Sequence, residues 1–316
     1  MEYGKLSIVV AMRNEERTLR VILNSYVTND YPNKEIILVD DESTDATPII
    51  AKEFARQYPF VKYHRITHDK KSGGNPVYRY GLRKATGDYI FLGDCGVILE
   101  TKDFFRRGIQ RLQEEGVGGV VPRCSIWVTD SFILKAKAPL YDLRYDNIKH
   151  IEKQIQRGEI YPQIYSRKVF NDVGGLSENI PWAVDTDLAK KMLQKGYKLV
   201  YEPRMKLKHQ YRDSIATLLE YHFRFGRLNK GAWKSHKQVI KSLYFLSLFP
   251  LLGLGLWNPL FLLGVLVHPL PFIIRMISLS IKAKEHPYRA YLLFYPLMTY
   301  IQNIPYSIGM IYGLFT

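Results

Sequence analysis

The feature of this sequence that most restricts its fold is a long C-terminal region with almost no charge. Between Ser242 and Ile281 the only formal charge is Arg275, and from Ala290 to Thr316 there is none. Each stretch exceeds the ~20 apolar residues that one helix needs to cross a bilayer. We therefore expect residues 242–316 to form a transmembrane region, with three hydrophobic segments near residues 243–256, 259–281 and 291–315.

Basic residues on both sides of this region predict how it is oriented. Lys230, Lys234, Lys237 and Lys241 recur at intervals of three or four residues, which places them on one side of a helix over residues 229–241. Such a helix is typical of attachment to an anionic membrane surface. Lys282, Lys284 and Arg289 follow the second apolar segment, so both flanks are expected in the cytoplasm. The apolar chain between them either crosses and returns or begins with a re-entrant leg, which predicts a multi-pass cell-membrane protein.

The net charge of +15 admits three classes of partner: nucleic acid, an anionic membrane surface or an anionic substrate. The densest run of lysines borders the apolar region, and no nucleic-acid recognition motif stands out. We therefore expect a membrane partner and no nucleic acid.

The N-terminal part alternates between short β-prone runs and helical patterns. This alternation is typical of an α/β fold with a parallel sheet that is covered by helices on both faces. The expected strands are residues 6–10, 35–39, 61–65 and 89–92, and the expected helices between them are residues 15–25, 48–57 and 77–85.

Aspartates follow two of the expected strands. Asp40 and Asp41 end the second strand, and Asp94 ends the strand that begins at Tyr89. Ligands of open α/β sheets bind beyond the carboxyl ends of the strands, so these carboxylates are candidate ligand-binding groups. The alternative for each of them is a cap on a turn.

Four segments, taken in order, resemble glycosyltransferase family 2, an inverting family whose catalytic domain has the GT-A fold. They are Ser7–Glu16 (SIVVAMRNEE), Ile37–Asp45 (ILVDDESTD), Ala85–Asp94 (ATGDYIFLGD) and Val184–Leu188 (VDTDL). The resemblance implies that residues 1–228 are a cytoplasmic GT-A catalytic domain that takes a sugar from a nucleotide-diphosphate donor. It places recognition of the nucleotide base on Asp40. The other donor-binding residues that it implies are Ala11, Arg13, Asn14, Glu15, Asp41, Lys71, Asp94, Arg224 and Arg227.

The metal motif of the family is incomplete in this chain. The family's Asp-x-Asp corresponds to Asp94-Cys95-Gly96, so Gly96 stands where the second aspartate is usual. The resemblance implies a divalent cation, Mg²⁺ or Mn²⁺, bound by Asp94, with His209 at a position where some relatives supply a histidine ligand. A single carboxylate is a weak site for such a cation. The sequence leaves open whether the metal is required, and His209 is otherwise an ordinary core or surface histidine.

The resemblance also assigns the catalytic base. Asp185 matches the second position of the family's Glu-Asp pair, with Val184 in place of the glutamate. Its role would be to take the proton of the acceptor hydroxyl in a single displacement with inversion. The alternative is that Asp185 or Asp187 caps the start of a helix.

Three functions remain open on the sequence. The first is transfer of one sugar to a membrane-associated acceptor, either a polyprenyl phosphate or a lipid-linked glycan. The second is polysaccharide synthesis, which is disfavoured because Tyr221 and Phe225 replace the glutamine and tryptophan of the Gln-x-x-Arg-Trp motif found in processive synthases. The third is a catalytically silent nucleotide-binding subunit, for which Gly96 is the motivation.

Overall fold

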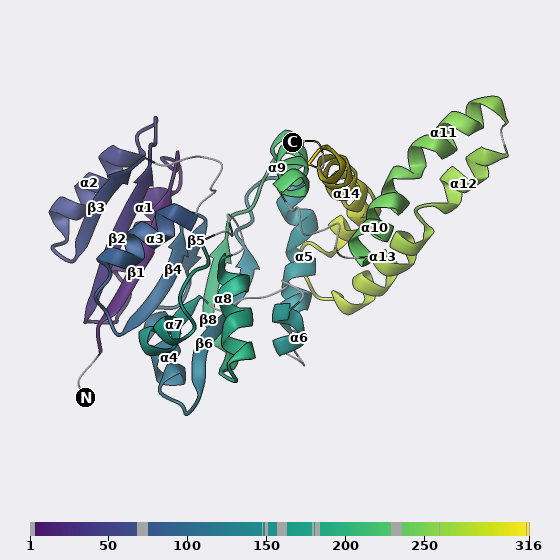
Figure 1. Cartoon of the computed structure of the whole chain (residues 1–316). Helices are drawn as coiled ribbons and strands as arrows, with labels where there is room; N and C mark the ends of the chain where they lie inside the picture. The colour runs from purple at the N-terminus through teal and green to yellow at the C-terminus, as the bar shows by residue number, and fades with distance from the viewer. Residues whose placement is uncertain are drawn as a thin grey trace. The chain divides into compact units, whose positions relative to one another are not determined.

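The computed structural model describes residues 4–67, 75–146, 148, 151–156, 163–178, 180, 184–228, 236–258, 260–313 and 315. The chain forms two compact units (Figure 1). Unit 1 comprises Met1–Ser125 and Asn147–His209, and unit 2 comprises Ile126–Asp146 and Gln210–Thr316. The predicted division at residue 228, with a basic helix over 229–241 and a transmembrane region over 242–316, stays a prediction. Lys71, Lys230 and Lys234 lie outside the described residues.

Unit 1 is built on one eight-stranded sheet with the order β3-β2-β1-β4-β7-β6-β8-β5. The four strands β3, β2, β1 and β4 are parallel, as the alternating pattern predicts. Beyond β4 the sheet is mixed, because β7 pairs antiparallel with both β4 and β6. The strands are β1 (Leu6–Met12), β2 (Lys34–Asp41), β3 (Val61–Ile66), β4 (Tyr89–Asp94), β5 (Val97–Leu99), β6 (Val117–Ile126), β7 (Ile164–Ser166) and β8 (Lys198–His209).

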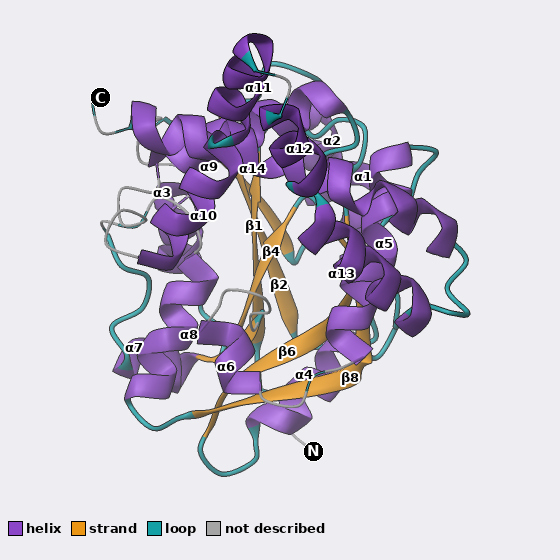
Figure 2. Ribbon diagram, turned by 90° about the vertical axis from the view of Figure 1, so that its right-hand side faces the viewer, coloured by secondary structure: helices purple, strands orange, loops and turns teal. Residues whose placement is uncertain are grey.

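Helices cover both faces of the parallel strands (Figure 2). Nearly every residue of β1 and β2 is buried, which is the pattern of a strand packed on both sides. On one face Tyr26 of α1 meets the ring of Phe91 edge-on, and on the other face α3 approaches Val9. The helices of unit 1 are α1 (Leu19–Val27), α2 (Thr47–Gln57), α3 (Asn75–Lys84), α4 (Phe104–Leu112), α6 (Ile151–Gln156), α7 (Arg167–Asp172) and α8 (Val184–Gln194).

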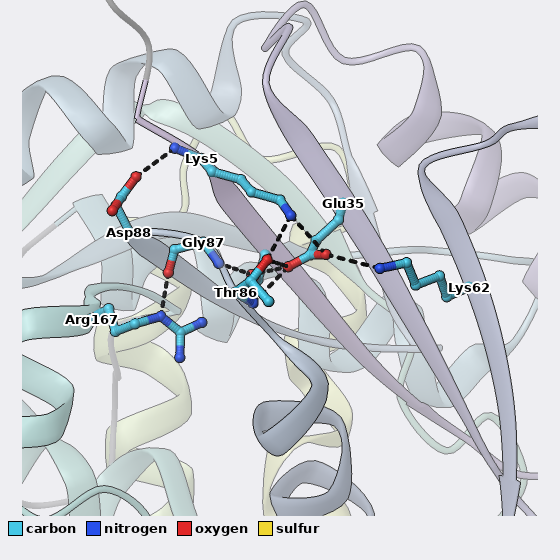
Figure 3. Close-up of polar contacts among 8 residues, drawn as sticks. Lys5, Glu35, Lys62, Thr86, Gly87, Asp88 and Arg167 are labelled. Carbon is cyan, nitrogen blue, oxygen red and sulfur yellow. Dashed lines mark hydrogen bonds and ion pairs between the residues drawn. The ribbon is translucent and has the colours of Figure 1, made fainter.

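A buried glutamate joins the amino-terminal ends of the strands (Figure 3). Glu35 is only 3% exposed, and its Oε1 accepts hydrogen bonds from the Ser7 hydroxyl and from the backbone N–H and hydroxyl of Thr86. Its Oε2 lies 3.0 Å from Lys5 Nζ and 3.5 Å from Lys62 Nζ. Burial by itself raises the pKa of Glu35, but these donors outweigh it and lower the pKa to about 2.

Unit 2 is helical. Its two most extensively packed helices are α9 and α14, whose backbones touch because glycines lie at the crossing. A Cβ on Gly309 would lie 2.0 Å from the carbonyl oxygen of Phe223, and one on Gly226 would lie 2.1 Å from that of Tyr306. The helices of unit 2 are α5 (Phe132–Asp146), α9 (Ile215–Leu228), α10 (His236–Leu246), α11 (Leu248–Trp257), α12 (Phe261–Val267), α13 (Leu270–Lys282), the 3₁₀ helix η3 (Arg289–Phe294) and α14 (Tyr295–Tyr312).

An apolar hairpin extends from these helices. Helices α11 and α12 lie side by side, and Figure 1 shows them as the projecting end of unit 2. Leu256 and Trp257, at the turn, are 92% and 81% exposed. Among the residues that the structure describes, one helical stretch, Phe261–Lys282, which joins α12 and α13, is long and apolar enough to cross a bilayer. Gln238–Leu254, from α10 into α11, is a shorter apolar stretch.

Candidate active site

The carboxyl ends of three parallel strands lie at one level of the sheet in unit 1. In the strand register Met12 of β1 pairs with Asp40 of β2, and Ala11 pairs with Asp94 of β4. The backbones of Asp40 and Asp94 therefore flank the end of the same strand. This is the edge at which open α/β sheets bind their ligands.

Asp40 is fully buried, with 0% exposure. Its Oδ1 accepts the backbone N–H of Ser43 at 2.9 Å, its Oδ2 accepts the Tyr63 hydroxyl at 2.8 Å, and Arg65 Nε lies 3.9 Å from Oδ2. Burial first, and then the bond to Asp40, raise the pKa of Tyr63 to about 12, so the phenol keeps its proton and stays a donor at neutral pH. These donors fix the orientation of the Asp40 carboxylate, and each of its oxygens has a further lone pair.

Two loops, which follow β1 and β2, are joined by hydrogen bonds. The backbone N–H of Asn14 donates to Ser43 Oγ at 3.0 Å, and Asn14 Oδ1 accepts the backbone N–H of Thr44 at 2.9 Å. Asn14 and Glu42 both have φ near +54°, at 54° and 53°, a conformation that is uncommon outside glycine. Such backbone strain persists where surrounding contacts fix it, and it is concentrated at functional sites.

The remaining predicted residues of these loops belong to the same network. Arg13 Nη1 lies 3.3 Å from Asp41 Oδ2. The backbone N–H of Glu15 donates to Thr47 Oγ1 at 2.7 Å, at the start of α2. The structure therefore brings Arg13, Asn14, Glu15, Asp40 and Asp41 together, and their role in donor binding stays a prediction.

Asp185 is the second residue of α8, and its Oδ1 accepts the backbone N–H of Thr186 at 2.7 Å. Burial, and then the charge of Asp185, raise the pKa of Tyr165 well above its ordinary value. Tyr165 is in β7, the neighbour of β4. The nearby Asp187 has a structural role, because it accepts the Ser177 hydroxyl at 2.7 Å and lies 3.3 Å from Lys191 Nζ.

His209 ends β8 and pairs with Val97 of β5, three residues beyond Asp94. The backbone alone supports this proximity, because the Asp94 side chain lies outside the described residues. Among the side chains that the structure does describe, no three histidine, cysteine, aspartate or glutamate groups lie together as a metal site. Divalent cations at nucleotide sites often take only one or two ligands from the protein and the others from phosphate oxygens and water.

Arg224 and Arg227 are placed on α9, in unit 2. They belong to the helix whose glycine meets α14, so their position along that helix is fixed by close packing. Lys71 lies outside the described residues.

Three residues hold Asp40 that the sequence patterns did not single out as site residues: Ser43, Tyr63 and Arg65. A signal for them exists in the sequence. In a parallel pair β3 lies beside β2, alternate residues share a face, and the register pairs Arg65 with Asp40.

The sheet is open, the loops after β1 and β2 are joined by hydrogen bonds, and a buried carboxylate lies at the strand ends. Together these features are typical of α/β domains that bind nucleotides. The family model described as Glycosyl transferase family 2 matches residues 7–174, just over half of the 316 residues, and the chain belongs to this family. The resemblance found in the sequence is confirmed.

Similar proteins extend the likeness along the whole chain. The dolichyl N-acetyl-α-D-glucosaminyl phosphate 3-β-D-2,3-diacetamido-2,3-dideoxy-β-D-glucuronosyltransferase of Methanococcus voltae is 23% identical over 98% of this chain and 97% of its own length. Glycosyltransferase AglE of Haloferax volcanii is 22% identical over 78% of this chain and 80% of its own. The mannosyltransferase PcManGT of Pyrobaculum calidifontis, solved with GDP-Man and Mn²⁺, has the same fold, with a TM-score of 0.60, 18% identity and coverage of 99% of this chain and 88% of that one.

Proposed function

We propose that this protein transfers a sugar from a nucleotide-diphosphate donor to a lipid-linked acceptor at a membrane. The observation that carries the proposal is the buried Asp40 carboxylate at the ends of β1, β2 and β4, held by Ser43 and Tyr63. The Methanococcus voltae relative, whose name states a dolichyl N-acetyl-α-D-glucosaminyl phosphate acceptor, matches 98% of this chain, including unit 2.

The proposed reaction is one displacement with inversion at the anomeric carbon. Asp40 accepts an N–H of the nucleotide base and fixes the donor, and Arg13 lies on the adjacent loop beside Asp41. The acceptor hydroxyl attacks the anomeric carbon as the bond from that carbon to the diphosphate oxygen breaks. The hydroxyl proton passes to Asp185, and the nucleoside diphosphate leaves.

A divalent cation fits this proposal. Asp94 and His209 would hold the ion, which would neutralise charge on the diphosphate leaving group. The structural neighbour PcManGT was solved with Mn²⁺, which supports Mn²⁺ as the ion to test first. Because Gly96 replaces a carboxylate, we expect weaker metal binding than a complete Asp-x-Asp would give.

Unit 2 supports the membrane part of the proposal. Its helices carry exposed Leu256 and Trp257 at the tip of the α11–α12 hairpin, and the run Phe261–Lys282 has the length of a bilayer crossing. Lys282 and Lys284 follow that run. We propose a multi-pass cell-membrane protein, with residues 1–228 as its cytoplasmic catalytic part.

The test is transfer by the purified full chain. It is incubated with radiolabelled UDP- and GDP-sugars, Mn²⁺ and membrane lipid extract, beside the Asp185→Asn variant as a control for the base. We expect a labelled product that partitions into organic solvent, and much less of it with the variant.

Other outcomes would point to other functions. Label found only in a long water-soluble polymer would contradict the proposal and favour a polysaccharide synthase. Donor binding without transfer across a wide panel of donors would favour the silent subunit. Equal transfer by wild type and Asp185→Asn would refute the assignment of the base.

A further inference from the structure

Unit 2 contains a group of basic side chains that the proposed donor chemistry does not use. Lys137 lies on α5, Arg212 precedes α9, and His222 lies on α9. Two contacts with aromatic rings, together with neighbours in the sequence, link their positions. Lys137 Nζ lies 5.9 Å from the centroid of the Tyr211 ring, and the Arg212 guanidinium lies 5.0 Å from the centroid of Tyr221, the residue before His222.

The charges in this group act on one another. Burial, and then the charge of Arg212, lower the pKa of Lys137 to about 8. Burial, and then the charges of Lys137 and Lys241, lower the pKa of His222 to about 4. At pH 7 Lys137 is therefore mainly a cation and His222 is neutral.

The acidic group of α5 that is closest in sequence is engaged elsewhere. Asp142 lies 3.0 Å from His286 Nε2. Lys137 and His222 are half-buried and Arg212 is exposed. Like charges near one another reduce stability unless an anion joins them. The group of Lys137, Arg212 and His222 therefore has the charge of an anion-binding site.

Apolar side chains lie beside this group. Ile215 and Leu219 are 53% and 38% exposed, and they precede His222 on α9 by seven and three residues. Residues at these spacings share one face of a helix. An exposed apolar face next to clustered cations matches an amphiphile that joins an anionic head to a hydrocarbon chain.

We propose that Lys137, Arg212 and His222 bind the phosphate group of the lipid-linked acceptor, with its hydrocarbon chain along Ile215 and Leu219. Arg212 supplies the planar pair of N–H donors that suits a phosphate, Lys137 supplies a point charge, and neutral His222 donates one N–H. The proposal rests on the proposed function, because it specifies the chemical class of the acceptor as a phosphate ester of a long apolar alcohol.

The experiment measures binding and needs no sugar transfer. The full chain in an uncharged detergent is titrated with farnesyl phosphate, and separately with farnesol, inorganic phosphate and phosphatidylglycerol vesicles. We expect farnesyl phosphate to bind at least about tenfold more tightly than farnesol or inorganic phosphate, because it satisfies both halves of the site.

The variants are Lys137→Gln, Arg212→Gln and Arg212→Lys, with Lys135→Gln as the matched control. Lys135 lies on the same helix and pairs at 3.6 Å with Asp130. We expect each glutamine variant to weaken farnesyl phosphate binding about tenfold or more, the value expected when a hydrogen bond to a charged group is lost. Arg212→Lys keeps the charge, and it takes the place of Arg212→Gln in the binding measurement if that variant does not fold. Lys135→Gln should bind as wild type does.

Three results would overturn the proposal. The first is an unchanged affinity of the folded glutamine variants for farnesyl phosphate. The second is an affinity of the wild type for phosphatidylglycerol vesicles that equals its affinity for farnesyl phosphate. The third is a loss of UDP or GDP affinity in the same variants, which would assign the cations to the donor. Failure of the proposed function appears separately, as absence of organic-soluble product in the transfer assay, because the binding assay does not depend on that reaction.

Discussion

Replacing Glu35 with glutamine tests whether the polar network at the amino-terminal ends of the strands stabilises unit 1. The carboxylate accepts bonds from Ser7 and Thr86 and faces the amines of Lys5 and Lys62 (Figure 3). Glutamine has nearly the same shape but no charge, so the variant loses both ion pairs and keeps the packing. The change lies at the opposite end of the strands from Asp40.

The size of the effect follows from the pKa of Glu35. The fold lowers it from 4.5 to about 2. At ~1.4 kcal/mol per pKa unit, and allowing for screening at the half-exposed lysines, the charge contributes about 2–3 kcal/mol to the free energy of unfolding. Because the folded pKa is below the unfolded one, this contribution is complete above pH 4.5 and is lost as the pH falls towards 2.

Thermal melts of wild type and Glu35→Gln from pH 3 to 7 measure this dependence. We expect the variant to melt on the order of 5–10 °C lower at pH 7, with the difference shrinking towards pH 3. Glu53→Gln is the control, because Glu53 is 44% exposed and pairs only with the surface residue Arg20 among the contacts described. A difference that is absent at pH 7, or that grows as the pH falls, would refute the reasoning.

Three further predictions concern the site and unit 2. Asp185→Asn should lower kcat at saturating donor by on the order of 10³-fold while nucleotide affinity is retained, and an unchanged kcat would contradict its role as base. Tyr63→Phe should raise the KM for the donor about tenfold, because the substitution removes a hydrogen bond to the buried Asp40 carboxylate. Tyr58→Phe, the same change at another tyrosine of unit 1, should leave that KM unchanged. Gly309→Ala should destabilise unit 2 by about 1–3 kcal/mol in detergent melts, because the added methyl group overpacks the contact with α9. Gly253→Ala is the control, because a Cβ there meets open space. Equal melting temperatures of the two variants would refute the backbone contact.

Local patterns in the N-terminal sequence predicted most of the elements there. The expected helix over residues 48–57 is α2 (Thr47–Gln57), which begins with proline in its first turn, where the missing N–H costs nothing. The expected strand over residues 61–65 is β3 (Val61–Ile66). These segments were predictable because each has one consistent period and clear end signals.

The middle of the chain was predicted less well. Helix α5 begins at Phe132 and has Pro139 inside it, and no local signal in the sequence marks it as one helix. The sequence of α5 lacks a strong amphipathic period. The helix packs against Leu218 of α9 and Met298 of α14, which lie far away in the chain. Tertiary packing, and not local propensity, decides a helix of this kind.

The sequence by itself determined the class of the protein, the carboxylates at the strand ends and the apolar C-terminal region, because each depends on short-range pattern or on composition. Only the tertiary structure decided which groups hold Asp40, and that Lys137 lies beside Tyr211 and Arg212 beside Tyr221 in unit 2. Contacts between residues far apart in the chain leave no periodic signal. They arise from strand register and helix packing, which many distant side chains determine together.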